Sequence, residues 1–133
     1  MKIVPESHRD LLSDNVRAFA FLVTVMADGS PQVTPVWFNT DGETILINSA
    51  RGRIKDRNMR QRPQVAMAIP DPHNPYRYLQ IRGVVESFSE QGGKEHIDML
   101  SRKYTGREFY TSARPGEVRV IYRIRPDRVT VNG

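Results

Sequence analysis

Residues 18–30 read Ala-Phe-Ala-Phe-Leu-Val-Thr-Val-Met-Ala-Asp-Gly-Ser, a β-rich run that ends in a hairpin signal. Residues 31–39 form a second, loosely alternating run. Thr40-Asp41-Gly42 then turns the chain again, and residues 43–48 form a third run. Runs joined at Asp-Gly turns are typical of antiparallel hairpins. The pattern therefore predicts a three-stranded antiparallel meander. Pro35 cannot donate to a ladder, so it marks an edge, a bulge or a strand end.

Further strands and helices are predicted downstream and upstream of this region. Strands are expected at residues 64–69, 76–88, 117–125 and 127–131, and helices at 7–14, 49–61 and 89–103. Residues 70–75 contain three prolines and are predicted to form a loop, and Gly83 is predicted to bend its strand. The sequence thus predicts a mainly β protein, an antiparallel barrel of six or seven strands with two or three short helices.

The bulk composition indicates one globular domain, residues 1–133. An apolar fraction of 38% indicates a small core, and this composition is compatible with burial of part of the apolar surface between subunits. No run approaches the ~18 apolar residues of a membrane span. The N-terminus reaches charged residues too early for a secretory signal, so the cytoplasm is the expected location. The absence of cysteine excludes disulfides and thiolate metal sites.

The excess positive charge of the chain is concentrated in one short segment. The full sequence has 20 basic and 15 acidic residues, a net charge of +5. Residues 51–62 hold six basic residues and one acid, so this segment alone accounts for +5. Such concentration in an otherwise neutral domain indicates an anion site.

The placement of this segment favours a phosphate as the anion. It follows a predicted strand directly, and Ser49 is a candidate N-cap for its helix. The first turn of such a helix offers free N–H groups and the positive end of the dipole to a phosphate. Two alternatives remain open, a plain solvated basic face and a nucleic-acid surface. Nucleic acid is disfavoured because no aromatic residue lies between Asn39 and Tyr76.

No constellation of side chains in the sequence indicates catalysis by the protein alone. The three histidines lack metal-type spacing, and no serine lies in a Gly-x-Ser-x-Gly setting. We therefore expect no metal ligands and no catalytic side chain. An anion site without acid–base residues is expected where a bound cofactor supplies the reactivity. Trp37 and Tyr76 are either core and barrel-face residues or walls for a flat ring.

Three segments resemble the pyridoxamine-phosphate-oxidase-like split β-barrel flavoproteins. They are Asp28 to Phe38, Arg53 to Asn58 with the following Pro-Gln-Val-Ala-Met, and Asp71 to Tyr78 leading into Arg-Gly-Val-Val-Glu. The resemblance runs from about residue 11 to 131 and is nearest to the probable F420-dependent subgroup, whose members carry a similar Arg-x-Lys-x-x-Asn.

The resemblance implies a homodimeric, flavin- or deazaflavin-binding oxidoreductase with cofactor sites at the subunit interface. Carried over to this sequence, it implies that Arg53 and Lys55 pair with the cofactor phosphate. Polar contacts come from Asn48, Ser49 and Asn58. The ring system lies along Val36 and Trp37, and is flanked by Tyr76 of the other subunit.

The sequence departs from true pyridoxamine phosphate oxidases, because it lacks their C-terminal Arg-x-His. Oxidation of vitamin B6 is therefore not expected, and the cofactor is F420 or, alternatively, FMN. F420 has an acidic polyglutamate tail, which suits the remaining arginines of the segment, Arg51, Arg57, Arg60 and Arg62. The expected function is hydride transfer between F420 and a small unsaturated substrate. An FMN-dependent oxidoreductase and a non-catalytic flavin or deazaflavin carrier are the alternatives.

Overall fold

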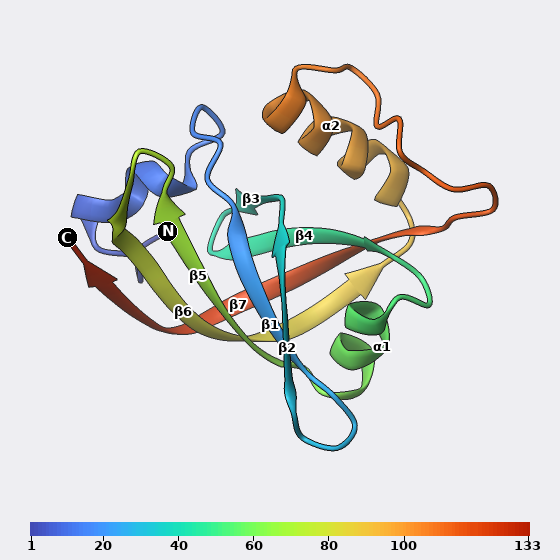
Figure 1. Ribbon diagram of the computed structural model, residues 1–133, viewed down its shortest axis with the longest axis horizontal. Helices are drawn as coiled ribbons and strands as arrows, with labels where there is room; N and C mark the ends of the chain where they lie inside the picture. Colours follow the sequence, from blue (N-terminus) through green and yellow to red (C-terminus); the bar gives the residue numbers. More distant parts are fainter.

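The computed structural model describes residues 1–133 and consists mainly of β-strands (Figure 1). In chain order the elements are the 3₁₀ helix η1 (Glu6–Leu12), β1 (Ala20–Val25), β2 (Pro31–Val36), β3 (Phe38–Asp41), β4 (Thr44–Ala50), α1 (Ile54–Gln61), β5 (Gln64–Asp71), β6 (Asn74–Ser89), α2 (Gly93–Thr105) and β7 (Arg119–Asn132). No helix is long and apolar enough to cross a membrane.

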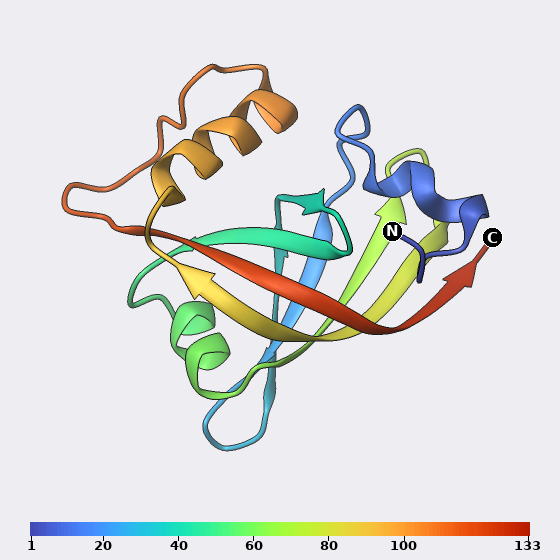
Figure 2. The same cartoon turned by 180° about the vertical axis from the view of Figure 1, so that it is seen from behind.

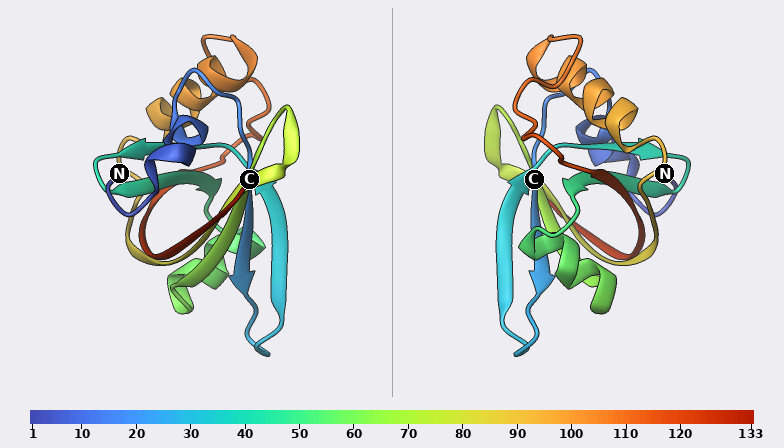
Figure 3. Two further views of the ribbon diagram at one scale, coloured as in Figure 1. Left: turned by 90° about the vertical axis from the view of Figure 1, so that its left-hand side faces the viewer. Right: turned by 90° about the vertical axis from the view of Figure 1, so that its right-hand side faces the viewer.

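The seven strands form one antiparallel sheet in the order β2-β1-β5-β6-β7-β4-β3. Its two edge strands, β2 and β3, are consecutive in the chain and are separated only by Trp37. Adjacent strands lie about 4.8 Å apart, so a single residue cannot span a flat sheet of this width. The sheet therefore curls until its edges approach each other, as the side views of Figure 3 show. The predicted mainly β split barrel is confirmed.

The predicted three-stranded meander is wrong. β1–β2 and β3–β4 are separate hairpins at opposite edges of the sheet. Both hairpins do turn at the predicted Asp-Gly pairs, where Gly29 and Gly42 have φ angles of +87° and +59°. The chain changes edge at Trp37. Alternation of residues reports local extended structure and does not identify the partner of a strand, so the sequence could not show this crossing. Pro35 lies on the edge strand β2, which is one of the three positions predicted for it.

Two predicted interruptions of the longest strands are also wrong. The expected proline loop at 70–75 is a tight hairpin, because β5 continues to Asp71 and β6 begins at Asn74. The expected break near Pro126 is absent, since β7 runs from Arg119 to Asn132. Pro126 is accommodated at a bulge, where the β6–β7 register shifts between Arg82 and Gly83. The predicted bend at Gly83 coincides with this irregularity.

The barrel interior holds the main core, and a smaller cluster lies under α2. Twenty buried residues form the core, among them Phe38, Ile45 and Tyr122, all fully buried. Ile97, Leu100 and Tyr104 of α2 form the smaller cluster, against which Trp37 packs. Figure 2 shows η1 beside the end of the β5–β6 hairpin, on the other side of the barrel from α2.

The two α-helices position the candidate site. α1 packs on β1 and β4, and α2 packs on β4 and β7; Figure 1 shows the ends of β4 and β6 between them. α1 ends at Gln61, as predicted from the following Arg-Pro. Ser49 is not its N-cap, because β4 continues through Ala50 and the helix begins only at Ile54. Gly52, with φ +90°, makes the turn between them.

Candidate functional site

A cavity of about 200 Å³ lies between α2 and the edge of the barrel. Its walls are mainly apolar and aromatic, with two cationic side chains and one amide. The lining residues are Phe19, Pro35, Val36, Trp37, Asn48, Lys55, Ile97, Leu100, Tyr110 and Arg119. A mostly apolar cavity with a few convergent polar groups is typical of a small-molecule site.

Stacked aromatic rings make one wall of this cavity rigid. The rings of Trp37 and Tyr104 lie 5.3 Å apart at an interplanar angle of 4°. Tyr110 meets Trp37 edge-on at 6.1 Å. The Tyr104 hydroxyl donates to the Ala18 carbonyl at 2.6 Å, which ties α2 to the start of β1. Burial raises the pKa of Tyr104 to about 12, so the hydroxyl stays protonated as this hydrogen bond requires. We refer to this space as the aromatic cavity.

A second, open depression of about 400 Å³ lies at the N-terminus of α1. Its lining includes four cationic side chains from two segments, and the residues are Gln32, Gly52, Arg53, Ile54, Lys55, Arg57 and Arg114. No side chain caps α1, so the N–H groups of its first turn are available to a ligand. The depression combines free N–H groups, a positive dipole end and fixed positive charge, which is the chemistry of a phosphate site. We call it the anion cradle.

Lys55 lies on both the anion cradle and the aromatic cavity. Its side chain is half-buried and no acid pairs with it. Burial lowers the pKa of Lys55, and the positive charges of Arg53 and Arg119 lower it further. A desolvated ammonium without a counter-ion gains most from an anionic ligand. Lys55 therefore marks the point at which a ligand would pass from its charged part to its ring.

Three arginines of the basic segment are already engaged within the protein. Arg51 pairs with Glu90 at 2.9 Å, and Arg60 pairs with Asp56 at 2.8 Å. Arg62 donates to the Val25 carbonyl at 2.7 Å. These three side chains are therefore poorly suited to bind an acidic tail.

Arg53 and Arg57 remain for a ligand. The guanidinium of Arg53 makes only a 3.5 Å contact with Glu117, and that of Arg57 has no acid partner. Arg114, from the loop that follows α2, adds a further unpaired guanidinium to the cradle.

Five of the eight predicted cofactor residues come together at these two connected spaces. Val36, Trp37 and Asn48 line the aromatic cavity, Arg53 lines the anion cradle, and Lys55 joins them. They come from β2, the β2–β3 junction, β4 and the start of α1, which the curl of the sheet brings to one edge.

The other three predicted residues lie elsewhere. Ser49 follows Asn48 on β4 and so points to the opposite face; its buried hydroxyl has no hydrogen-bond partner. Asn58 is buried and donates to Thr24 Oγ1 at 3.0 Å, holding α1 against β1. Tyr76 is 80% exposed on the β5–β6 hairpin and lines neither space within one chain. A contact between Tyr76 and this site would need a second subunit.

Sequence reasoning missed several polar or aromatic site residues, among them two arginines and a tyrosine. Arg119 begins β7, Tyr110 lies in the loop after α2, and Arg114 lies further along the same loop. Each is brought to the site by long-range pairing, in particular of β4 with β7. No local pattern in the sequence distinguishes these residues from surface positions.

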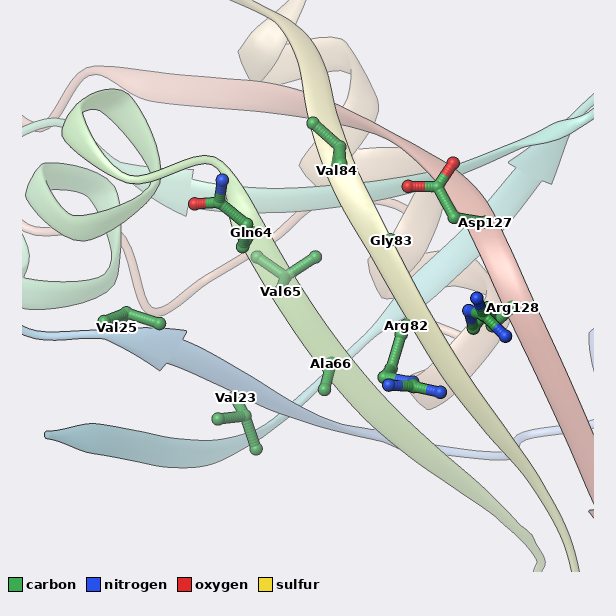
Figure 4. A pocket seen from close by; sticks show the side chains of 10 residues that line it. All are labelled: Val23, Val25, Gln64, Val65, Ala66, Arg82, Gly83, Val84, Asp127 and Arg128. Carbon is green, nitrogen blue, oxygen red and sulfur yellow. The ribbon is translucent and has the colours of Figure 1, made fainter. Parts of the chain in front are cut away.

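A further groove of about 400 Å³ lies on the outer face of the sheet, across β1, β5, β6 and β7 (Figure 4). Valines and an alanine form its floor, and Arg82 and Arg128 lie side by side across two paired strands. Neither arginine has an acid partner in the chain. Like charges on directly opposed strand positions repel each other. Asp127, the one acid of this lining, pairs with Arg125 at 3.2 Å and with neither Arg82 nor Arg128.

Comparison with known proteins agrees with this geometry. Residues 4–133 match the family model described as pyridoxamine 5'-phosphate oxidase. The chain belongs to the pyridoxamine 5'-phosphate oxidase family. No protein matches it among curated proteins.

Several solved structures are similar to this chain. An F420 reductase is 36% identical over 96% of this chain and 98% of that chain, with a TM-score of 0.82. A conserved hypothetical protein from Mycobacterium tuberculosis is 23% identical over 98% of this chain and 86% of its own, with a TM-score of 0.69. A putative pyridoxamine 5'-phosphate oxidase from Listeria innocua is 22% identical over 85% and 86%, with a TM-score of 0.62. The last two likenesses concern the fold alone.

The residues present fit a phosphorylated ring cofactor of the kind this oxidoreductase-like fold accommodates. The unpaired Lys55 ammonium and the uncapped α1 terminus suit its phosphate. The Val36–Trp37 wall suits a flat ring. No group of three or more His, Asp or Glu side chains could hold a metal ion.

Proposed function

We propose that this protein is an F420-dependent oxidoreductase that transfers hydride between the bound deazaflavin and a small unsaturated organic substrate. The observation that carries the proposal is Lys55, an unpaired and half-buried cation that joins an anion cradle to an aromatic-walled cavity. When bound, the cofactor supplies the hydride chemistry. The chain supplies binding, orientation and exclusion of water.

Each part of the site has a distinct role in this proposal. Arg53, Lys55 and the first turn of α1 bind the phosphate, and Val36 with Trp37 supports the ring. Arg57 and Arg114 are the cations left for an acidic tail, since Arg51 and Arg60 are paired within the chain. The same phosphate site would accept FMN, and the alternatives are an FMN-dependent oxidoreductase and a carrier without turnover. The tail cations and the 36% identical F420 reductase favour F420.

The functional unit in this proposal is a cytoplasmic homodimer. The apolar floor of the outer groove supports burial of this face against a second copy, and Arg82 and Arg128 would then need acidic partners from that copy. In that assembly Tyr76 of one subunit reaches the ring bound by the other. Nucleic acid is not part of this proposal, since four cationic side chains gather in the one anion cradle and no stripe of aromatic residues accompanies them.

The deciding experiment is a titration of the purified protein with F420 and with FMN, followed by fluorescence. Binding of F420 in preference to FMN is expected. If neither cofactor binds more tightly than roughly 100 µM, about 5–6 kcal/mol, the proposal is wrong. Oxidation of reduced F420 by a panel of enones and quinones, with and without the protein, separates an enzyme from a carrier.

Substitution Lys55→Ala tests the residue that carries the proposal. It is expected to weaken cofactor binding by the ~1.5–3 kcal/mol of a charge-assisted hydrogen bond, roughly 10- to 150-fold in Kd. Lys94→Ala is the matched control, because Lys94 is an exposed lysine of α2 that pairs with Asp98. Equal affinities of the two variants would remove Lys55 from the phosphate site.

A further inference from the structure

Arg119 is a buried cation of the aromatic cavity for which phosphate binding gives no role. It begins β7 and is 8% exposed. Its Nε donates to Asn48 Oδ1 at 2.8 Å, its Nη1 donates to Glu117, and its guanidinium lies 5.1 Å from the centre of the Tyr110 ring. A guanidinium carries five N–H donors. Nη2 has no acceptor within the protein although the side chain lines the cavity.

A chain of buried hydrogen bonds holds Arg119 in this orientation. The Asn48 amide group donates to the Gly93 carbonyl at 2.9 Å and lies 3.0 Å from His96 Nδ1. His96 Nε2 lies 2.8 Å from Asn39 Oδ1. Since Asn48 Nδ2 can only donate, Nδ1 is the acceptor and the proton of the imidazole is on Nε2. We call this series, from Asn39 through His96 to Asn48, the amide–histidine relay.

Both N–H donors of Asn48 and its side-chain oxygen are engaged in hydrogen bonds within the protein. Its two N–H donors go to Gly93 and His96, and its oxygen accepts from Arg119. Asn48 therefore lines the cavity without a donor to offer a ligand. Burial lowers the pKa of His96 to about 4, so the imidazole is neutral at neutral pH, as an accepting Nδ1 requires. The relay joins α2, β3, β4 and β7 behind one guanidinium.

The aromatic cavity is lined by two cations and no acid, so an electron-rich ligand group is favoured at Arg119. Lys55 and Arg119 both line the cavity, and Glu117 is the only acid paired with Arg119. The other walls are apolar, and an unsatisfied donor against such walls is costly unless a ligand accepts from it. The remaining N–H groups of Arg119 therefore suit an oxygen on an otherwise apolar ring.

We propose that Arg119 binds the oxygen-bearing edge of the ring in the aromatic cavity, and that the amide–histidine relay orients it for this contact. This inference rests on the proposed function. Flavins and deazaflavins both carry a pyrimidinedione edge, and this edge gains negative charge when the ring is reduced. A fixed cation there stabilises the reduced form more than the oxidised form.

The test compares Arg119→Gln with Arg123→Gln, which removes an exposed arginine of the same strand paired with Asp41. Kd is measured for oxidised and for reduced cofactor, F420 and FMN in parallel. In Arg119→Gln, binding of the oxidised form is expected to weaken about 10-fold and that of the reduced form about 100-fold. The control variant is expected to match the wild type. An unchanged ratio of the two affinities overturns the role of Arg119, whereas a wild-type protein that binds neither cofactor overturns the proposed function as well.

His96→Gln tests the relay and serves if Arg119→Gln fails to fold. It leaves every charge of the cavity in place, and is expected to shift the ratio of reduced to oxidised affinity in the same direction, by about 3- to 10-fold. In the Arg119→Gln background it is expected to cause no further shift, since it acts through Arg119. If His96→Gln lowers the melting temperature and leaves the ratio unchanged, His96 only supports the fold and the positioning role is excluded.

Discussion

At the residue scale, the neutral state of His96 makes stability depend on pH. Its pKa lies at about 4 in the folded chain, against 6.5 for the ordinary group, through burial and the nearby charges of Arg123 and Arg119. The unfolded chain therefore binds a proton between pH 6.5 and 4 that the folded chain does not. The contribution of neutral His96 to the free energy of unfolding is complete above pH 6.5 and is lost as the pH falls toward 4. It amounts to about 3 kcal/mol.

Urea unfolding between pH 7 and pH 4 checks this dependence. The wild type is expected to lose stability through this interval, and His96→Gln is expected to lose less, because its side chain does not titrate. Asp10 and Asp71 titrate below this window in both proteins, since ion pairs and hydrogen bonds lower the pKa of each. Parallel curves for the two proteins would contradict the assignment.

At the element scale, one buried carboxylate fixes α1 to the barrel. Asp56 accepts from Arg60 of the same helix, from the hydroxyl of Tyr122 on β7 and from the Gly52 amide in the turn before the helix. Burial disfavours the charged form, yet these three hydrogen bonds together lower the pKa of Asp56. The bond to Gly52 shapes the turn that presents the first N–H groups of α1. The anion cradle thus depends on a contact with the last strand of the chain.

Substitution Tyr122→Phe removes one donor from this carboxylate with little change of volume. It is expected to destabilise the fold by about 1–3 kcal/mol, the cost of leaving a buried acceptor less satisfied. Urea unfolding measures the loss. Tyr76→Phe is the control, because its ring is exposed. A Tyr122→Phe protein as stable as this control would show that Asp56 does not need the hydroxyl.

At the scale of the whole molecule, the proposed homodimer accounts for the unmatched outer face of the sheet. Light scattering is expected to give a mass of twice 15.3 kDa. Val84→Lys adds a charge to the outer groove and is expected to shift the protein toward the monomer, since a buried unpaired charge is costly in an interface. Phe109→Lys, at a residue that is 57% exposed beyond α2, is the control. A wild-type monomer at all concentrations would exclude this assembly.

Much of the fold follows from local patterns in the sequence. The Asp-Gly turns, the extended segments that form β1 and the first part of β7, and the end of α1 before Arg62-Pro63 were all predicted, because each depends on conformational preferences of a few neighbouring residues. The errors concern relations between distant segments. The crossing at Trp37, the continuity of β7 through Pro126 and the tight turn at Pro72 depend on strand pairing across the sheet.

The candidate site, like the fold, could be predicted from the sequence only in part. Arg53 and Lys55 stand out in the sequence because the net positive charge of the chain is concentrated around them. Only the tertiary structure separates the unpaired Lys55 from Arg51 and Arg62, whose partners Glu90 and Val25 are far away in the sequence. Arg60 differs, because it pairs with Asp56 four residues earlier on the same helix.

The sequence alone predicted a mainly β barrel, and it predicted an anion site directly after the strand at residues 43–48, since composition and short-range periodicity carry that information. The tertiary structure decided which cations remain free and which residues face them. It brought Arg119 and Tyr110 beside Trp37 and turned Asn48 from a ligand contact into a support for Arg119. The physical reason is that a side chain already paired within the protein cannot bind a ligand, and the curling of the sheet determines which side chains meet and pair.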